Sequence, residues 1–197
     1  MMLSLEHKTL FIHIPRTGGS WLTHKMWDFE TAKSPTEYHS YMQMGTKKAG
    51  THTTLAHVYN SYQGIDLDSF YKFTIVRHPY ERFQSAYSYF KHNTKTLVRH
   101  KIESLNDMMT WIEDGSTKQH LLPQSHWYDE RFDKIVKFEL LETFDPYPEI
   151  FLNKTWHDEK LTKIKKNYYG NLDRDLKKRV YRHYKRDFKL FDYDATL

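Results

Sequence analysis

The feature that most constrains the fold is a short stretch near the beginning of the chain, from Leu10 to Trp21. Its apolar run, Leu10 to Ile14, predicts a buried strand, and two adjacent glycines follow. Large apolar residues then recur at helical spacing, at Leu22, Met26 and Phe29. A strand, a glycine turn and a helix start favour anion binding, because glycine lets the backbone approach a ligand and helix-start amides point toward negative charge.

The turn itself reads Pro-Arg-Thr-Gly-Gly-Ser over residues 15–20. The Arg16 guanidinium and the hydroxyls of Thr17 and Ser20 can add hydrogen bonds to an anion. The common P-loop is different, because it has a glycine, four residues and then Gly-Lys-Ser/Thr. A plain strand–turn–helix connection without a ligand is the alternative interpretation of this stretch alone.

A second strand is predicted over residues 70–76, ending at Arg77, His78 and Pro79. Proline suits the first turn of a helix, and the helix is expected from about residue 80 to 91. Its apolar face is formed by Tyr80, Phe83, Tyr87 and Phe90. Ser85 lies nearly opposite, so we expect it to be free to meet a ligand rather than the core. The Arg77 guanidinium can grip a phosphate with two hydrogen bonds.

Further strands and helices alternate along the rest of the chain. Residues 105–112 predict a helix containing two core methionines, residues 135–139 a third strand, and residues 140–151 a short helical segment. Apolar residues spaced by four predict a final helix with a basic opposite face, at Leu172, Leu176, Val180, Tyr184 and Phe188. We expect one α/β domain over residues 1–197, with a mainly parallel central sheet flanked by helices.

Composition limits the expected location of the protein and the ligands that it can bind. The chain has no cysteine, residues 1–8 contain no signal-peptide pattern, and no segment approaches 18 consecutive apolar residues. We therefore expect no membrane span and a cytoplasmic location. The net charge of +5 suits an anionic ligand but is too small to argue for nucleic acid. His52 and His57 are five residues apart, which is a poor spacing for one metal ion on a helix, so no metal site is expected.

Together, the two motifs resemble those of sulfotransferases that use 3′-phosphoadenosine 5′-phosphosulfate (PAPS). The order Pro-basic-Thr-Gly-Gly-Ser resembles the 5′-phosphosulfate loop, and the segment from Phe73 to Tyr87 resembles the 3′-phosphate motif. The resemblance is strongest to the Golgi-type carbohydrate branch, which contains heparan sulfate 2-O-sulfotransferase and small bacterial relatives. Weaker similarity extends to residues 134–144 and to the ending at residues 184–193.

The resemblance implies a P-loop-like PAPS-binding fold and in-line transfer of a sulfuryl group to an acceptor hydroxyl or amine. It places the cofactor on Arg77, Ser85 and the loop residues Arg16, Thr17, Gly18, Gly19, Ser20 and Trp21. The family usually has lysine where Arg16 stands. Arginine keeps the charge but does not readily give up a proton, so we expect Arg16 to stabilise charge on the leaving phosphate. Gln124 and Ser125 fall where relatives place residues near the site.

A histidine serves as the base in the 2-O-sulfotransferase branch. The Gly-Thr-His-Thr-Thr-Leu stretch at residues 50–55 resembles the histidine segment of bacterial relatives, so His52 is our candidate base. His57 is the second choice, and a surface or capping role is the alternative for His52. The expected acceptor is a small molecule or a saccharide.

Three other functions stay open at this stage. A kinase-like nucleotide-binding protein would bind ATP and depend on magnesium, but the lysine loop and an aspartate after the second strand are missing. A nucleic-acid-binding module would use the basic residues of 160–189, where interspersed acidic residues argue against it, and we expect no nucleic-acid partner. Only an activity assay would distinguish an enzyme from an inactive protein that binds PAPS or its product.

Overall fold

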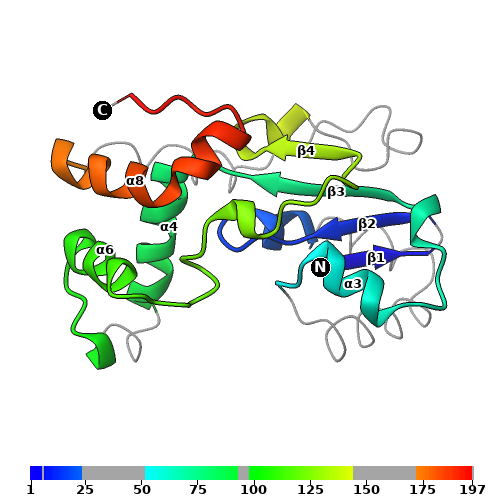
Figure 1. The fold of residues 1–197 in the computed structure, drawn as a ribbon, viewed down its shortest axis with the longest axis horizontal. Coiled ribbons are helices and arrows are strands. Elements are labelled where there is room, and N and C mark those ends of the chain that lie inside the picture. The colour runs from blue at the N-terminus through cyan, green and yellow to red at the C-terminus, as the bar shows by residue number, and fades with distance from the viewer. Residues whose placement is uncertain (6, 24–51, 93–97, 144–171, 197) are drawn as a thin grey trace. The chain divides into compact units, whose positions relative to one another are not determined.

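The computed structural model describes residues 1–5, 7–23, 52–92, 98–143 and 172–196 (Figure 1). The chain forms two compact units, each made from two separate segments. Unit 1 comprises Met1–Val76 with His126–Lys154, and unit 2 comprises Arg77–Ser125 with Thr155–Leu197. The expectation of one domain over residues 1–197 stays a prediction.

Unit 1 contains a sheet of four strands in the order β1-β2-β3-β4 (Figure 1). The strands are β1 (Met2–Ser4), β2 (Thr9–Ile12), β3 (Tyr71–Val76) and β4 (Lys134–Lys137). β1 is antiparallel to β2, whereas the β2–β3 and β3–β4 pairs are parallel. The predicted α/β class with a mainly parallel sheet is therefore confirmed.

The middle of this sheet is apolar on both faces. All four residues of β2 are buried, as are the last five of β3, which is typical of parallel strands covered on both sides. Phe11 pairs in register with Phe73, and their rings stack with centroids 5.1 Å apart. β1 was not predicted, because three residues are too few to show a periodic pattern.

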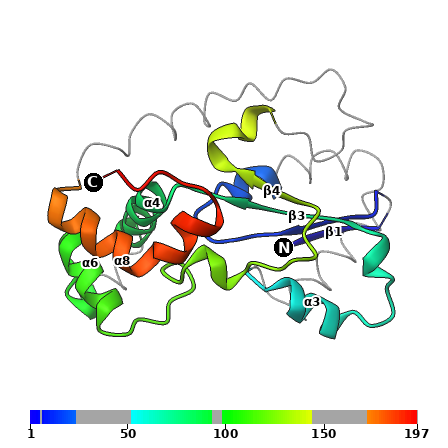
Figure 2. The same ribbon diagram turned by 45° about the horizontal axis from the view of Figure 1, so that its top comes forward.

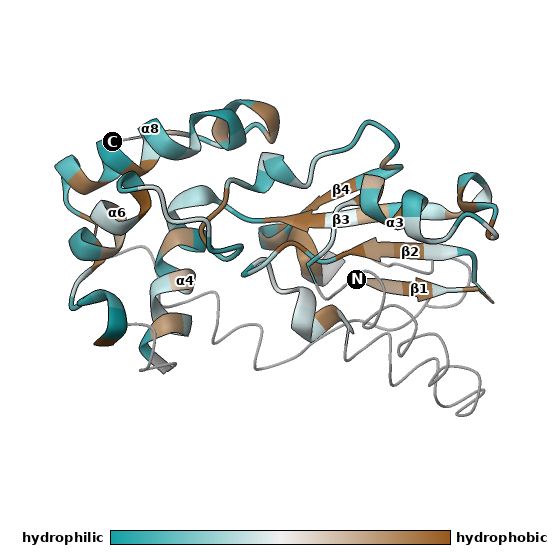
Figure 3. Cartoon of the chain, turned by 60° about the horizontal axis from the view of Figure 1, so that its bottom comes forward, coloured by the Kyte–Doolittle hydropathy of each residue, from teal (hydrophilic) through white to brown (hydrophobic). Residues whose placement is uncertain are grey.

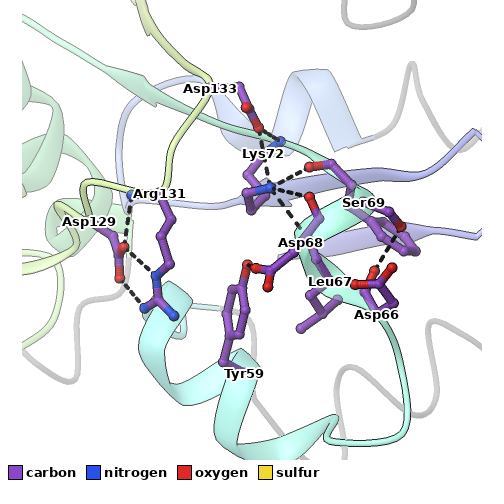
Figure 4. A network of polar contacts seen from close by, with 10 residues as sticks. Tyr59, Asp66, Leu67, Asp68, Ser69, Lys72, Asp129, Arg131 and Asp133 are labelled. Carbon is purple, nitrogen blue, oxygen red and sulfur yellow. Dashed lines mark hydrogen bonds and ion pairs between the residues drawn. The ribbon is translucent and has the colours of Figure 1, made fainter.

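A buried lysine anchors the start of β3 (Figure 4). The Lys72 ammonium donates to the carbonyl oxygen of Phe70 at 2.6 Å and lies 3.5 Å from the Asp133 carboxylate. It also donates to the carbonyls of Leu67 and Asp68, at the end of the 3₁₀ helix η1 (Leu67–Ser69). A cation satisfies such carbonyls well, and this contact fixes where β3 begins.

Unit 2 is helical, with α4 (Pro79–His92), α6 (Leu105–Glu113) and α8 (Arg174–Leu190) packed against one another (Figures 1 and 2). All three predicted helices are therefore confirmed. α6 begins at a capping box formed by Ser104 and Asp107 and ends before Gly115, whose φ of 91° suits glycine. Met108 and Met109 are fully buried, as expected for core residues.

The apolar stripe of α8 packs into the core of unit 2, and most of the remaining residues of the helix are hydrophilic (Figure 3). Leu176, Val180, Tyr184 and Phe188 are all buried, which confirms the spacing of four. The helix departs from helical geometry at Tyr184, where φ is −99° and ψ is 19°. Leu172 lies before the helix and packs against the same core.

Three shorter elements also lie in the described chain. α3 (Leu55–Ser61) is capped by Thr54, and η2 (Gln124–His126) is a single turn. The helical segment expected over residues 140–151 is in part the 3₁₀ helix η3 (Phe138–Thr143), and the rest lies outside the described residues. Met26, Phe29 and the predicted basic residues 160–171 also lie outside them.

Within the described segments, no helix is both long enough and apolar enough to cross a membrane. The cytoplasmic location stays a prediction.

Candidate functional site

The predicted anion loop leaves β2 and turns directly into a helix. Residues 19–23 are helical, and the Leu22 amide donates to the Gly18 carbonyl at 3.2 Å. The amides of residues 19–21 therefore stand at a helix start, where no earlier carbonyl of the helix can accept from them. The strand, turn and helix start predicted for residues 10–21 are confirmed.

The loop holds its shape through unusual backbone angles. Arg16 has a φ of 69°, which is the left-handed region and costs a non-glycine residue about 1 kcal/mol. Gly18 has a φ of 88°, and a Cβ there would lie 2.6 Å from the Phe138 ring. The Thr17 hydroxyl donates to the Ile14 carbonyl at 2.9 Å, so this buried side chain closes the turn. Strain of this kind persists where surrounding contacts fix the backbone, as they do here.

Gly19 lies against a histidine ring. A Cβ on Gly19 would come within 2.1 Å of His13 Cδ2 and 2.5 Å of His13 Nε2. His13 is 6% exposed and follows β2. The second glycine is therefore needed to let the helix start approach the His13 ring, a reason that the sequence pattern did not supply.

His52 lies beside the same ring. Its Nδ1 is 3.0 Å from the His13 carbonyl oxygen, and the two rings meet edge to face with centroids 4.7 Å apart. A carbonyl oxygen only accepts, so Nδ1 must carry the proton and donate it. In the neutral ring the lone pair is then on Nε2, which is the atom that can accept a proton. The Trp127 indole donates to the His52 carbonyl at 3.2 Å and holds the backbone in place.

The other loop residues differ in exposure. Ser20 is exposed, whereas Arg16 and Trp21 are half-buried. His57 is exposed on α3, and its backbone amide donates to the Thr54 hydroxyl in the helix cap. The structure thus brings His52 to the strand that carries the loop and places His57 in a surface helix.

Arg77 is the first residue of unit 2 and is 2% exposed. Its Nε donates to Glu81 at 3.0 Å, which forms a buried ion pair one helical turn along α4. Glu81 was not predicted as a site residue, although its position four residues after Arg77 is the spacing at which such pairs form. The pair fixes the direction of the guanidinium.

Gln124 holds the backbone of Arg77 from both sides. Its Oε1 accepts from the Arg77 amide and its Nε2 donates to the Arg77 carbonyl, both at 2.8 Å. The Asp187 carboxylate in turn accepts from the amides of Gln124 at 2.7 Å and Ser125 at 2.8 Å. Asp187 is fully buried in α8, so a charged group secures the turn that positions Arg77.

Arg82 is a second buried guanidinium on the same helix. It is 2% exposed, and its Nη1 donates to the Leu122 carbonyl at 2.9 Å. Burial lowers the pKa of Arg82, while Tyr184 and Asp187 oppose that shift and Arg77 adds to it. The side chain therefore ties α4 to the segment that precedes Gln124.

The expectation that Ser85 is free of the core is wrong. Ser85 is 3% exposed, because α4 is buried around its whole circumference along its first two turns. A helical wheel based on the apolar residues did not predict the burial of Ser85, because Glu81, Arg82 and Gln84 are polar and nevertheless buried. The role of Ser85 as a phosphate ligand stays a prediction.

Comparison with known proteins places this chain in a family. A model of the sulfotransferase family matches residues 1–145, and the chain belongs to that family. It is also similar to carbohydrate sulfotransferase 10 of Danio rerio, with 27% identity over an alignment that covers 64% of this chain. The chain spans about half of that relative's length, 48%. No solved structure gave a significant match. The family predicted from the two motifs is therefore confirmed.

Proposed function

We propose that this protein transfers a sulfuryl group from PAPS to a hydroxyl or amine of a saccharide or small molecule. The observation that carries the proposal is the His52 imidazole, oriented by the His13 carbonyl beside the ring that touches Gly19. Family membership and the loop motif support the same conclusion.

The residues of both motifs fit a nucleotide with several negative charges. The loop offers helix-start amides, a guanidinium and a hydroxyl, in Gly19, Arg16 and Ser20. Unit 2 offers a guanidinium that is buried and oriented, with Arg77 held by Glu81 and Gln124. These groups are hydrogen-bond donors or cations, the set that phosphate and sulfate oxygens require.

When bound, PAPS would supply a sulfuryl group attached to a phosphate leaving group. His52 accepts the acceptor's hydroxyl proton at Nε2 while Nδ1 stays bonded to the His13 carbonyl. Arg16 and the amides of residues 19 and 20 stabilise negative charge at the loop. Arg77 and Ser85 bind a phosphate. Arg16 keeps its proton throughout, because a guanidinium does not release one near neutral pH.

The relative's name supports a saccharide as the acceptor, since that protein is a carbohydrate sulfotransferase. Sugar hydroxyls are weak nucleophiles that benefit from a base in the position of His52. We therefore place saccharides first in any search for the acceptor.

The donor is tested by calorimetric titration of the full chain with 3′-phosphoadenosine 5′-phosphate, 5′-AMP and ATP in the absence of magnesium. We expect a clear preference for the 3′-phosphorylated nucleotide, reduced at least about tenfold in Arg77→Lys, because lysine cannot form the two-pronged contact. Equal affinity for the three nucleotides, or tighter binding of ATP with magnesium, would contradict the proposal and favour a kinase-like protein.

The base is tested by transfer of labelled sulfate from PAPS to a panel of saccharides. His52→Ala should lower turnover by about 100-fold or more while nucleotide affinity is retained, because a general base contributes about 10² to 10⁴. His57→Ala is the matched control, since His57 is exposed on α3. Full turnover in His52→Ala would show that His52 is not the base. Nucleotide binding by the unmodified chain without any transfer would indicate an inactive member of the family.

A further inference from the structure

Unit 2 contains a cavity of about 380 Å³ whose lining includes neither Arg77 nor Ser85. It is lined by residues of α4, of α8 and of the segment that follows α8. Its volume falls within the usual range for small-molecule sites. Side chains that line it include Tyr80 and Gln84 from α4, Lys177 from α8, and Asp194 and Thr196 from the C-terminal segment.

One of these side chains is buried without satisfying its polar group. Tyr80 is 6% exposed, and its hydroxyl has no hydrogen-bond partner among the described residues. Gln84 is 7% exposed and lines the same cavity. Buried polar groups are nearly always bonded, so the unsatisfied Tyr80 hydroxyl at this cavity indicates that something else satisfies it.

These groups belong to a different row of α4 from Ser85. Tyr80 and Gln84 are four residues apart and form one row, while Glu81 and Ser85 form the neighbouring row, turned by about 100°. The cavity is therefore separate from the predicted phosphate site, and the inference below does not rest on the proposed function.

The two charged side chains that line the cavity differ in whether they already have polar partners. Lys177 forms no ion pair in the part of the chain that the structure describes, and its ammonium lies 6.0 Å from the Tyr80 ring centre. Asp194 already accepts hydrogen bonds from the amide and the hydroxyl of Thr196. The cation, not the carboxylate, is thus the group that attracts a charged ligand.

His78 forms a neutral wall of the same cavity. The Tyr80 amide donates to its Nδ1 at 3.3 Å, so its Nε2 carries the proton and donates to the Asp194 carbonyl at 3.0 Å. Its ring also packs edge to face against Phe188, with centroids 5.6 Å apart. Leu172 adds an apolar contact. The cavity therefore presents one cation, one amide, one tyrosine hydroxyl and an aromatic surface.

We propose that this cavity binds a small hydroxylated anion, such as a sugar acid or a sulfated monosaccharide. Lys177 pairs with the carboxylate or sulfate, and the Gln84 amide bonds to hydroxyl groups both as donor and as acceptor. The Tyr80 hydroxyl gains its missing partner, and the ring beneath contacts the apolar face of the ligand.

The test is calorimetric titration of the full chain with D-glucuronate, D-glucose 6-sulfate, neutral D-glucose, inorganic sulfate and L-alanine. We expect one of the two sugar anions to bind at least about tenfold more tightly than glucose or sulfate, and the stronger one identifies the anionic group. Lys177→Met should weaken that binding about tenfold. Lys178→Met is the control, because Lys178 is exposed and pairs with Asp175.

A second variant separates binding from folding. Tyr80→Phe removes a buried hydroxyl that has no partner, so the protein without ligand should melt at the same or a higher temperature while the sugar anion binds more weakly. A lower melting temperature would show that the hydroxyl is bonded in the free protein and would overturn the proposal. So would tightest binding of L-alanine, equal binding in Lys177→Met, or failure of both sugar anions to bind.

Discussion

In unit 1, the candidate site is shaped by its backbone, whereas in unit 2 it is shaped by side chains. Arg16 and Gly18 have left-handed angles, and Gly19 leaves just enough room for the His13 ring. Arg77 instead has its guanidinium held by Glu81 and its backbone held by Gln124. Both sites are predicted to bind oxyanions, one through amides and the other through a cation.

The difference shows what each site tolerates. A backbone site depends on the absence of atoms, so adding a single methyl group damages it. A side-chain site depends on a relay of hydrogen bonds, here from Asp187 through Gln124 to Arg77, so removing one charge damages it. The hydrogen-bond relay joins residues that are far apart in the sequence, because Asp187 lies in α8 and Arg77 lies just before α4.

The largest effect on nucleotide binding is expected from Gly19→Ala in unit 1. Its Cβ would lie 2.1 Å from His13, so the loop or the ring must move, at a cost of about 1–3 kcal/mol in the free energy of unfolding. Binding of 3′-phosphoadenosine 5′-phosphate should be lost as well. Denaturant unfolding and calorimetry measure both, and Gly64→Ala is the control because nothing lies within 4 Å of a Cβ there. Normal binding in Gly19→Ala would contradict the backbone account.

A smaller effect on nucleotide binding is expected from Asp187→Asn in unit 2. The amide keeps one acceptor but loses the charge that receives two backbone amides, so stability should fall by about 1.5–3 kcal/mol. Because Gln124 then positions Arg77 less well, the preference for the 3′-phosphorylated nucleotide over 5′-AMP should also decrease. Asp175→Asn is the control, since that side chain is exposed on the same helix. A loss of stability with an unchanged preference would show that Asp187 supports the fold alone.

The smallest effects come from two hydroxyl deletions that compare the units directly. Thr17→Val removes the bond to the Ile14 carbonyl, and Tyr184→Phe removes the 2.7 Å bond to the Leu121 carbonyl, each at about 1 kcal/mol. Burial raises the pKa of Tyr184, so its hydroxyl stays protonated and donating at neutral pH. Only Thr17→Val should weaken nucleotide binding, because Thr17 belongs to the loop itself. Equal losses of nucleotide affinity in the two variants would contradict the distinction between the backbone site of unit 1 and the side-chain site of unit 2.

Much of the fold could be predicted because its elements carry strong local signals. The apolar run before the loop, the proline at the start of α4 and the spacing of four in α8 all led to correct elements. β1 is too short to show such a pattern. The polar residues of α4 misled the placement of Ser85, because Glu81 and Arg82 are buried together with their hydrogen-bond partners rather than through hydrophobicity.

The two motifs of the candidate site were predicted from the sequence, but the contacts that hold their residues in place were not. Arg16 and Arg77 follow from local order, whereas the left-handed angle of Arg16 and the contact between His13 and Gly19 depend on tertiary packing. Asp187 gave one usable signal, an acidic residue set within the apolar stripe of α8 beside Phe188. A charge in such a position is expected only where buried donors need it.

The division of each unit into two segments has a consequence for how the protein is made. β3 is complete at Val76, but its parallel partner β4 begins at Lys134, after the whole of residues 77–125. On the ribosome, one edge of β3 must therefore wait for its neighbour while the first part of unit 2 is being synthesised. An open apolar strand edge is a risk for association with other chains, so slowed translation after residue 76 should favour aggregation of the nascent protein.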